Sequence, residues 1–358
     1  MKSLYQFTLI VLFFGAVHFS AHAGYSALYV FGDALSTTTN NPTVGSLYYG
    51  KRYSNGRVWV EVLAQRQGVG ISNNWSYFDC NSSNLVTNVG NFTAPANASN
   101  ALFVIWVNNS DLHDVALDGN TSLTTWSNAI VRSQTNHFKA ITNLYAKGVR
   151  TLIAPNAVDI SKVPYFNAYA STNFIRQRCI AYNTNFAATL NLARAACPGL
   201  KIYSPDYFAL LNNVLTNAAY YGLTNFTVGG LSKDAIDSVN YSPNIPAATN
   251  GRGTNFIFWY DLGPTAKFHA VIADEAQELI APALVTEMIT FTGSNQLEVV
   301  NMPVGLNGFV DGVVDVSLTN WTVKASFNST NTTQSVFVPS AGPQWFYRLR
   351  FPYAWSWP

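Results

Sequence analysis

Serine, histidine and aspartate side chains that could support chemistry occur at two places in the chain. Ser36 is a candidate nucleophile and His113 a candidate base, since a serine hydroxyl attacks a carbonyl when a neighbouring group takes its proton. For Ser36, however, hydrogen bonding within a turn is the favoured interpretation. Asp111, His113 and Asp114 could ligate a metal ion, but so short a cluster is more typical of a solvated loop. The sequence therefore predicts no metal site and no other cofactor.

The elements that must position these residues follow from the apolar pattern of the first 290 or so residues. Apolar runs typical of strands buried on both faces are 26–31, 101–107, 149–154 and 200–204. Helical spacing of apolar residues alternates with them, over 126–145, 175–193 and 268–280. This order predicts an α/β fold, a three-layer α/β/α sandwich around a central parallel sheet. Ligands bind such sheets at the carboxyl ends of the strands, where Asp33 and Asp111 are expected.

The pattern changes near Gly293 to short alternating runs, as in Val314, Val316 and Leu318, separated by turn-forming residues. We therefore predict a main domain over 24–292 and a small β-rich module over 293–358. The aromatic tail 345–357 is interpreted as a core-facing strand, and a sugar-stacking surface or an envelope-sorting segment are the alternatives.

The first 23 residues have the features of a secretory signal. Lys2 precedes an apolar run from Leu9 to Val17, and Ala21-His22-Ala23 supplies small residues for cleavage near Ala23. No later stretch reaches the roughly 18 apolar residues of a transmembrane helix. We expect a secreted, periplasmic or cell-envelope protein without a transmembrane segment.

Composition excludes one class of partner. Of the 358 residues 11% are charged and 14% aromatic, and the formal net charge is +2, so there is no basic footprint for nucleic acid. Cys80, Cys179 and Cys197 show neither metal-ligand nor CxxC spacing, and buried free thiols are the favoured interpretation.

Four ordered segments resemble the signature blocks of the GDSL (SGNH) hydrolases, also called GDSL-like lipases and acylhydrolases, over residues 26–281. They are Tyr29–Ser36 (YVFGDALS), Tyr53–Glu61 (YSNGRVWVE), Ile105–Asp111 (IWVNNSD) and Phe258–Thr265 (FWYDLGPT). The resemblance implies an SGNH-hydrolase, flavodoxin-like fold and, at the level of the family, a hydrolase acting on ester bonds.

The same resemblance implies that the reacting groups have been replaced. Family members use a serine nucleophile, a histidine base and an aspartate three residues before that histidine. Those positions correspond here to Ala34, Gly263 and Tyr260. Of the groups that hold the oxyanion in the family, the glycine remains as Gly56 and the asparagine amide is replaced by Ser110.

We therefore predict a pseudoenzyme whose former cleft binds a glycan or a lipid ester without cleaving it. The residues expected to bind in that cleft are Asp33, Ser36, Gly56, Asn108, Ser110 and Asp111. A weak or altered ester hydrolase and a structural envelope protein remain as alternatives. The sequence does not indicate an oligomeric state.

Overall fold

A computed structural model describes residues 24–39, 47–237, 251, 253–318, 320–339 and 345–353, without the side chain of residue 118. The expected signal segment, 1–23, lies outside the described residues, as do Trp355 and Trp357. In the part described, no helix is both long and apolar enough to cross a bilayer.

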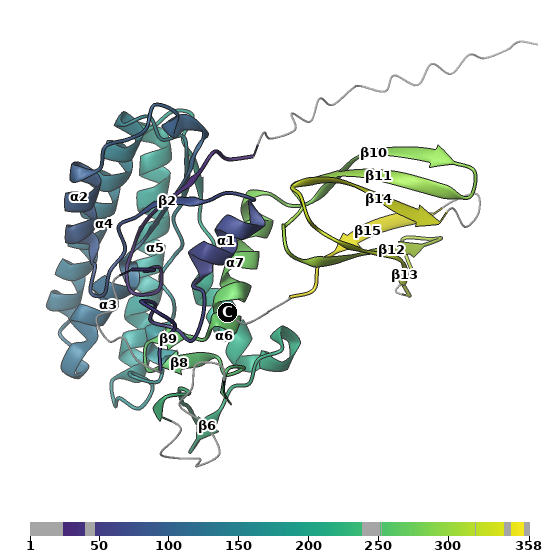
Figure 1. Cartoon of the computed structure of the whole chain (residues 1–358). Helices are drawn as coiled ribbons and strands as arrows, with labels where there is room; N and C mark the ends of the chain where they lie inside the picture. The colour runs from purple at the N-terminus through teal and green to yellow at the C-terminus, as the bar shows by residue number, and fades with distance from the viewer. Residues whose placement is uncertain are drawn as a thin grey trace, which may run out of the picture.

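A five-stranded parallel sheet forms the centre of the described main domain, with the four strands that the apolar runs predict and one more, β2 (Figure 1). Its order is β2-β1-β3-β4-β5, with β1 at Leu28–Gly32, β2 at Ile71–Asn74, β3 at Leu102–Trp106, β4 at Thr151–Ile153 and β5 at Lys201–Tyr203. The predicted α/β class is confirmed. Every residue of β3 is buried, which is why its sequence is continuously apolar.

Within the described ranges, seven α-helices surround this sheet. On one face α2 (Ser82–Asn91), α4 (Leu123–Ala146) and α5 (Thr172–Ala196) pack side by side, and α1 (Trp59–Arg66) packs on α7 (Ala266–Ile280) on the other (Figure 1). The remaining helices are α3 (Asn108–Ala116) and α6 (Tyr207–Thr216), with 3-10 turns at Ala98–Asn100, Leu117–Gly119, Ile160–Lys162 and Ala218–Tyr221. The three helices expected from apolar spacing are present, and Gly148 follows α4 with a φ of 94° that suits glycine.

The three cysteines are buried free thiols, as predicted. Cys179 lies within α5 and Cys197 caps its C-terminus. At about 1.5 Å rise per residue, one helix separates the two by roughly 27 Å, which a disulfide does not bridge.

The pairing of β1 with β3 determines where the carboxyl ends of these two strands lie. β1 pairs with β3 in parallel from Leu28 opposite Leu102 to Gly32 opposite Trp106, so both strands end at the same level. The Asp33 backbone N–H then donates to Trp106 O at 3.1 Å. As a result, the residues after β1 and those at the start of α3 meet at one edge.

Two short hairpins complete this edge. Strands β6 (Thr227–Val228) and β7 (Leu231–Ser232) form one, and β8 (Phe258–Tyr260) and β9 (Gly263–Pro264) form the other. In the second hairpin Tyr260 pairs directly with Gly263. The loop before α1 holds this hairpin, because Ser54 Oγ donates to Pro264 O at 3.1 Å and Asn55 Oδ1 accepts from Ala266 N at 2.7 Å.

The C-terminal module consists of two three-stranded antiparallel sheets. One has the order β10-β11-β14 (Leu284–Phe291, Ser294–Val300, Thr333–Pro339) and the other β13-β12-β15 (Thr322–Asn328, Asn307–Val313, Phe346–Arg350). Because β10 pairs with β11 throughout, the antiparallel strands begin at Leu284, before the expected boundary at 293.

The alternating stretch expected at Val314, Val316 and Leu318 is not a strand. Val314 lies in a bend and Val316 in a turn after β12, and these two residues and Leu318 are exposed, because β12 ends at Val313, the last residue that pairs with β15. A small core of Leu297, Val299, Met302, Val310, Val336 and Val338 lies between the sheets instead.

The module contacts α1 and α7 of the main domain. Val304 N donates to Arg66 O at 3.1 Å and Arg66 Nη1 donates back to Val304 O at 3.2 Å. Beyond β15, Phe351 packs against the module core, whereas Tyr353 donates to Glu275 Oε1 on α7 at 2.6 Å. The described part of the aromatic tail therefore serves packing within the chain.

Candidate ligand-binding site

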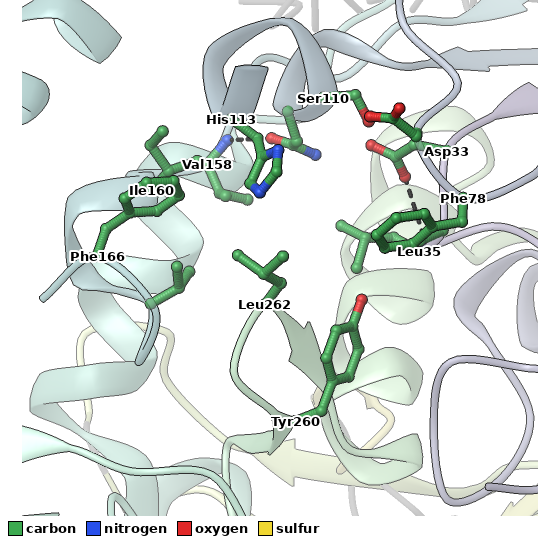
Figure 2. Close-up of a pocket in the computed structure, with 14 residues that line it drawn as sticks. Asp33, Leu35, Phe78, Ser110, His113, Val158, Ile160, Phe166, Tyr260 and Leu262 are labelled. Carbon is green, nitrogen blue, oxygen red and sulfur yellow. Dashed lines mark hydrogen bonds between the residues drawn. The ribbon is translucent and has the colours of Figure 1, made fainter. Parts of the chain in front are cut away.

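A pocket with a cavity volume of about 60 Å³, open to solvent, lies at the carboxyl ends of β1 and β3 (Figure 2). This is the edge at which the strand order predicts a cleft. Its walls are Asp33, Ala34, Leu35, Phe78, Asp79, Asn109, Ser110, His113, Val158, Ile160, Val163, Phe166, Tyr260 and Leu262. Five of these residues are polar and the other nine are apolar or aromatic, so the pocket combines a polar side with a larger apolar one.

Ala34 lines this pocket and lies between aromatic rings. It packs in one buried cluster with Tyr53 and Tyr260, whose ring centroids are 6.1 Å apart. The methyl group offers no nucleophile, so the position that corresponds to the family serine can only contribute a surface.

Tyr260 fills the space beside Gly263. A Cβ built on Gly263 would lie 2.6 Å from Tyr260 Cζ and 2.7 Å from Cδ1, closer than side chains approach one another. Burial, followed by the neighbouring Asp33 carboxyl, raises the pKa of Tyr260 well above its ordinary value. The position that corresponds to the family histidine is thus buried beneath a neutral tyrosine ring.

Asp33 is the most perturbed acid of the pocket. Its side chain is 2% exposed, and burial raises its pKa from 3.8 to about 7, although hydrogen bonding from Leu35 N to Oδ1 at 3.0 Å lowers it. Among the described residues, Oδ2 has no hydrogen-bond partner. A buried polar atom of this kind is costly unless a ligand or water satisfies it.

Asn109 supplies a second buried group without a partner. Its Oδ1 accepts from Val158 N at 3.0 Å, which fixes the carboxamide, while Nδ2 has no hydrogen-bond partner in the described part of the chain. The Asn109 amide lies close enough to the Asp33 carboxyl to lower its pKa. Nδ2 and Oδ2 nevertheless do not meet the distance and angle of an ordinary hydrogen bond. An amide donor therefore does line the pocket, at the position before Ser110.

The expected cleft residues are divided between the pocket and the core. Asp33 and Ser110 line the pocket, but Ser36, Gly56, Asn108 and Asp111 do not. Ser36 Oγ accepts from the buried Trp59 Nε1 at 3.0 Å, and Asn108 Nδ2 donates to Pro155 O at 3.0 Å. Gly56 is buried in the loop that holds the β8–β9 hairpin.

Asp111 turns away from the pocket into a buried hydrogen-bond network. Ser82 Oγ donates to Asp111 Oδ1 at 2.9 Å and Ser133 Oγ to Oδ2 at 2.6 Å. His137 Nδ1 lies 3.3 Å from Ser133 Oγ, and burial lowers its pKa. These contacts join α2, α3 and α4, so the role of Asp111 is structural.

His113 lies at the pocket wall beside two carboxylates. Its Nδ1 is 3.6 Å from Asp114 Oδ1, and Asp79 is the third member of a group whose ligand atoms all lie within 4.8 Å of one another. Burial and the charge of Asp114 raise the pKa of Asp79. These three residues, rather than the trio with Asp111, could hold a cation.

Comparison with known proteins gives remote similarities only. No protein-family model matches the sequence, and no curated protein matches it. Among solved structures, the chain is similar to the lipase Lip_vut3 from a goat rumen metagenome, at 10% identity and a TM-score of 0.44, over 71% of this chain and 97% of that one. It is also similar to Axe2, an acetylxylan esterase from Geobacillus stearothermophilus, at 12% identity and a TM-score of 0.43, over 73% and 95% of the two chains. A third is the acetyl xylan esterase AlAXEase, at 8% identity and a TM-score of 0.41, over 71% and 99%.

Proposed function

We propose that this protein binds a carbonyl-containing, largely apolar ligand in the pocket and does not cleave it. The observation that supports this best is the pair of unpartnered groups, Asp33 Oδ2 and Asn109 Nδ2, in a pocket without the family's nucleophile and base. A covalent hydrolytic route needs both groups to act together, whereas binding needs only a shaped wall and partners for polar atoms.

Two neighbouring groups define the polar end of the ligand. The Asn109 amide donates a hydrogen bond, which a carbonyl oxygen accepts. Asp33, with a pKa of about 7, is available either as a protonated donor or as an ionised acceptor near neutrality. An ester carbonyl or a carboxylic acid fits this pair.

The rest of the pocket favours a lipid ester over a glycan. Val158, Ile160, Phe166 and Leu262 form a wall facing the polar side (Figure 2). Sugar hydroxyls buried against such a wall would lose hydrogen bonds to water without replacement, whereas an acyl group would bury apolar surface favourably. We further propose that the protein acts after export, on the basis of the signal pattern in residues 1–23.

Titration calorimetry with ethyl butyrate, butyrate and cellobiose tests the proposal. We expect the two acyl compounds to bind and cellobiose not to bind. Asn109→Ala and Asp33→Ala should weaken acyl binding at least tenfold, and the exposed Asn191→Ala and Asp315→Ala serve as matched controls. Equal affinities of all four variants, or tighter binding of cellobiose, would contradict the proposal.

A weak ester hydrolase is a second candidate because Ser110 and His113 line the same pocket. They lie three residues apart on α3, and His113 Nδ1 faces Asp114 at 3.6 Å. Nitrophenyl butyrate turnover and fluorophosphonate labelling, each compared with heat-killed protein, test this activity. Turnover that is lost in both Ser110→Ala and His113→Ala would favour the hydrolase over a binding protein, and Ser36→Ala is the control for a serine outside the pocket.

A further inference from the structure

The loop that follows β4 is held against the pocket by side chains. Residues 154–159 have no regular secondary structure, so their backbone groups need partners elsewhere. Side chains supply several of these partners: Asn108 Nδ2 donates to Pro155 O at 3.0 Å, and Trp106 Nε1 donates to Asn156 O at 3.1 Å. The loop is therefore attached to the end of β3 and the start of α3, where the pocket lies.

Asn183, on α5, holds the next residue of this loop with both ends of its carboxamide. The Ala157 N–H donates to Asn183 Oδ1 at 3.0 Å, and Asn183 Nδ2 donates to Ala157 O at 2.9 Å. Asparagine is intrinsically unfavourable within a helix, and these two bonds to the buried Ala157 account for its place in α5. Together they fix the peptide groups on both sides of Ala157.

The second of these peptide groups also orients Asn109. Because a peptide group is planar, the Ala157 carbonyl and the Val158 N–H keep a fixed relation. The carbonyl accepts from Asn183, and the N–H at the other side of the same plane donates to Asn109 Oδ1 at 3.0 Å (Figure 2). An N–H can only donate, so it selects the oxygen of the Asn109 carboxamide. Nδ2, which has no partner among the described residues, is thereby left for the pocket.

We propose that Asn183 is a positioning residue, which presents the Asn109 amide to a ligand carbonyl through the peptide group between Ala157 and Val158. This proposal rests on the proposed binding function and adds to it a residue that determines specificity for a carbonyl without lining the pocket. Without Asn183 this peptide group is free to rotate. The Asn109 carboxamide then turns, and its oxygen repels a ligand carbonyl, while the apolar wall of the pocket is unchanged.

Two ligands of nearly the same shape test this role, one with a carbonyl and one without. Calorimetry on the full chain measures the dissociation constants of ethyl butyrate and butyl ethyl ether. The wild type should bind the ester about tenfold more tightly, since only the ester offers a carbonyl oxygen to Asn109. In Asn183→Ala this ratio should fall at least threefold, while the ether binds as in the wild type. Asn191→Ala, which changes an exposed asparagine of the same helix, is the matched control and should retain the ratio.

Two further variants distinguish positioning from a general effect on stability. Asn183→Asp keeps an acceptor for the Ala157 N–H but loses the donor to Ala157 O, so it should also lower the ratio. It replaces Asn183→Ala if that variant does not fold. In the background of Asn109→Ala, Asn183→Ala should lower the ratio no further, because the group that it positions is absent.

The outcomes separate the positioning role from the binding function. If the wild type discriminates the two ligands and Asn109→Ala does not, a wild-type ratio in the Asn183 variants overturns the positioning role alone. An equal loss of affinity for ester and ether in these variants, or a further fall in the double variant, overturns it as well. If the wild type binds neither ligand, or binds both equally, the binding function fails and the positioning role fails with it.

Discussion

The ring of Tyr260 occupies the space in which a side chain at Gly263 would begin. The two residues are paired in the β8–β9 hairpin, and a Cβ on Gly263 would lie 2.6 Å from Tyr260 Cζ. The large ring at one position therefore requires glycine at the other. At the two positions that align with the aspartate and the histidine of the hydrolase blocks, tyrosine and glycine therefore form a single packing arrangement.

Gly263→Ala should destabilise the protein by about 1–3 kcal/mol, since overpacking forces the Tyr260 ring to move. Tyr260→Ala combined with Gly263→Ala should cost less than the sum of the two single changes, because the double variant removes the collision. Urea unfolding measures the three free energies. Gly70→Ala is the matched control, as no atom lies within 4 Å of a Cβ at that position. A Gly263→Ala variant as stable as this control would contradict the arrangement.

Ala34→Ser should not create esterase activity. The new hydroxyl would lie between Tyr53 and Tyr260, with no histidine at position 263 to take its proton. Loss of the histidine of the triad costs about 10⁶ in turnover in subtilisin, so a serine without its base should show no turnover above background. Nitrophenyl ester assays and fluorophosphonate labelling of the variant and wild type measure this. Labelling that appears only in the variant would show that another group acts as the base.

The sequence predicted the strands that carry the site better than the side chains that line it. Strands β1 and β3 were predictable because burial on both faces makes them continuously apolar, whereas β2, with the polar sequence ISNN at the sheet edge, carries no such signal. Asn109 was not favoured as the donor because the family alignment assigns the donor to position 110, so that an amide at 109 could replace it only if the loop were re-aimed. Its orientation depends on a hydrogen bond to Val158, 49 residues away, which spacing along α3 does not reveal.

The orientation of Asp111, which was expected in the cleft, could not be predicted from the sequence either. It follows a buried strand and aligns with a family block, yet it faces Ser82 and Ser133. A carboxylate at the carboxyl end of a strand can turn toward solvent or toward the next helix, and only the serines contributed by α2 and α4 determine which.

Asp33→Asn should change how stability depends on pH. The folded-state pKa of about 7 lies above the ordinary 3.8, so the contribution of Asp33 is full below pH 3.8 and is lost as the pH rises to 7. The asparagine variant lacks this loss. Its stability relative to the wild type should therefore increase by up to about 1.4 kcal/mol per pH unit between pH 4 and 7 and stay constant above. Urea unfolding across this range, with Asp315→Asn as the exposed control, measures the effect. A constant difference at all pH values would mean that Asp33 titrates normally.

His269→Leu should protect the protein from mild acid. His269 is fully buried on α7, neither ring nitrogen has a partner among the described residues, and burial lowers its pKa from 6.5 to about 3. Because the folded-state pKa is lowered, stability is full above pH 6.5 and is lost as the pH falls toward 3, where the unfolded chain alone binds the proton. Between pH 8 and 5 the wild type should lose about 2 kcal/mol that the variant retains. Urea unfolding at both pH values measures the difference, and Val271→Leu, also buried on α7, controls for repacking. A parallel loss in wild type and His269→Leu would show that the imidazole is protonated in the folded state.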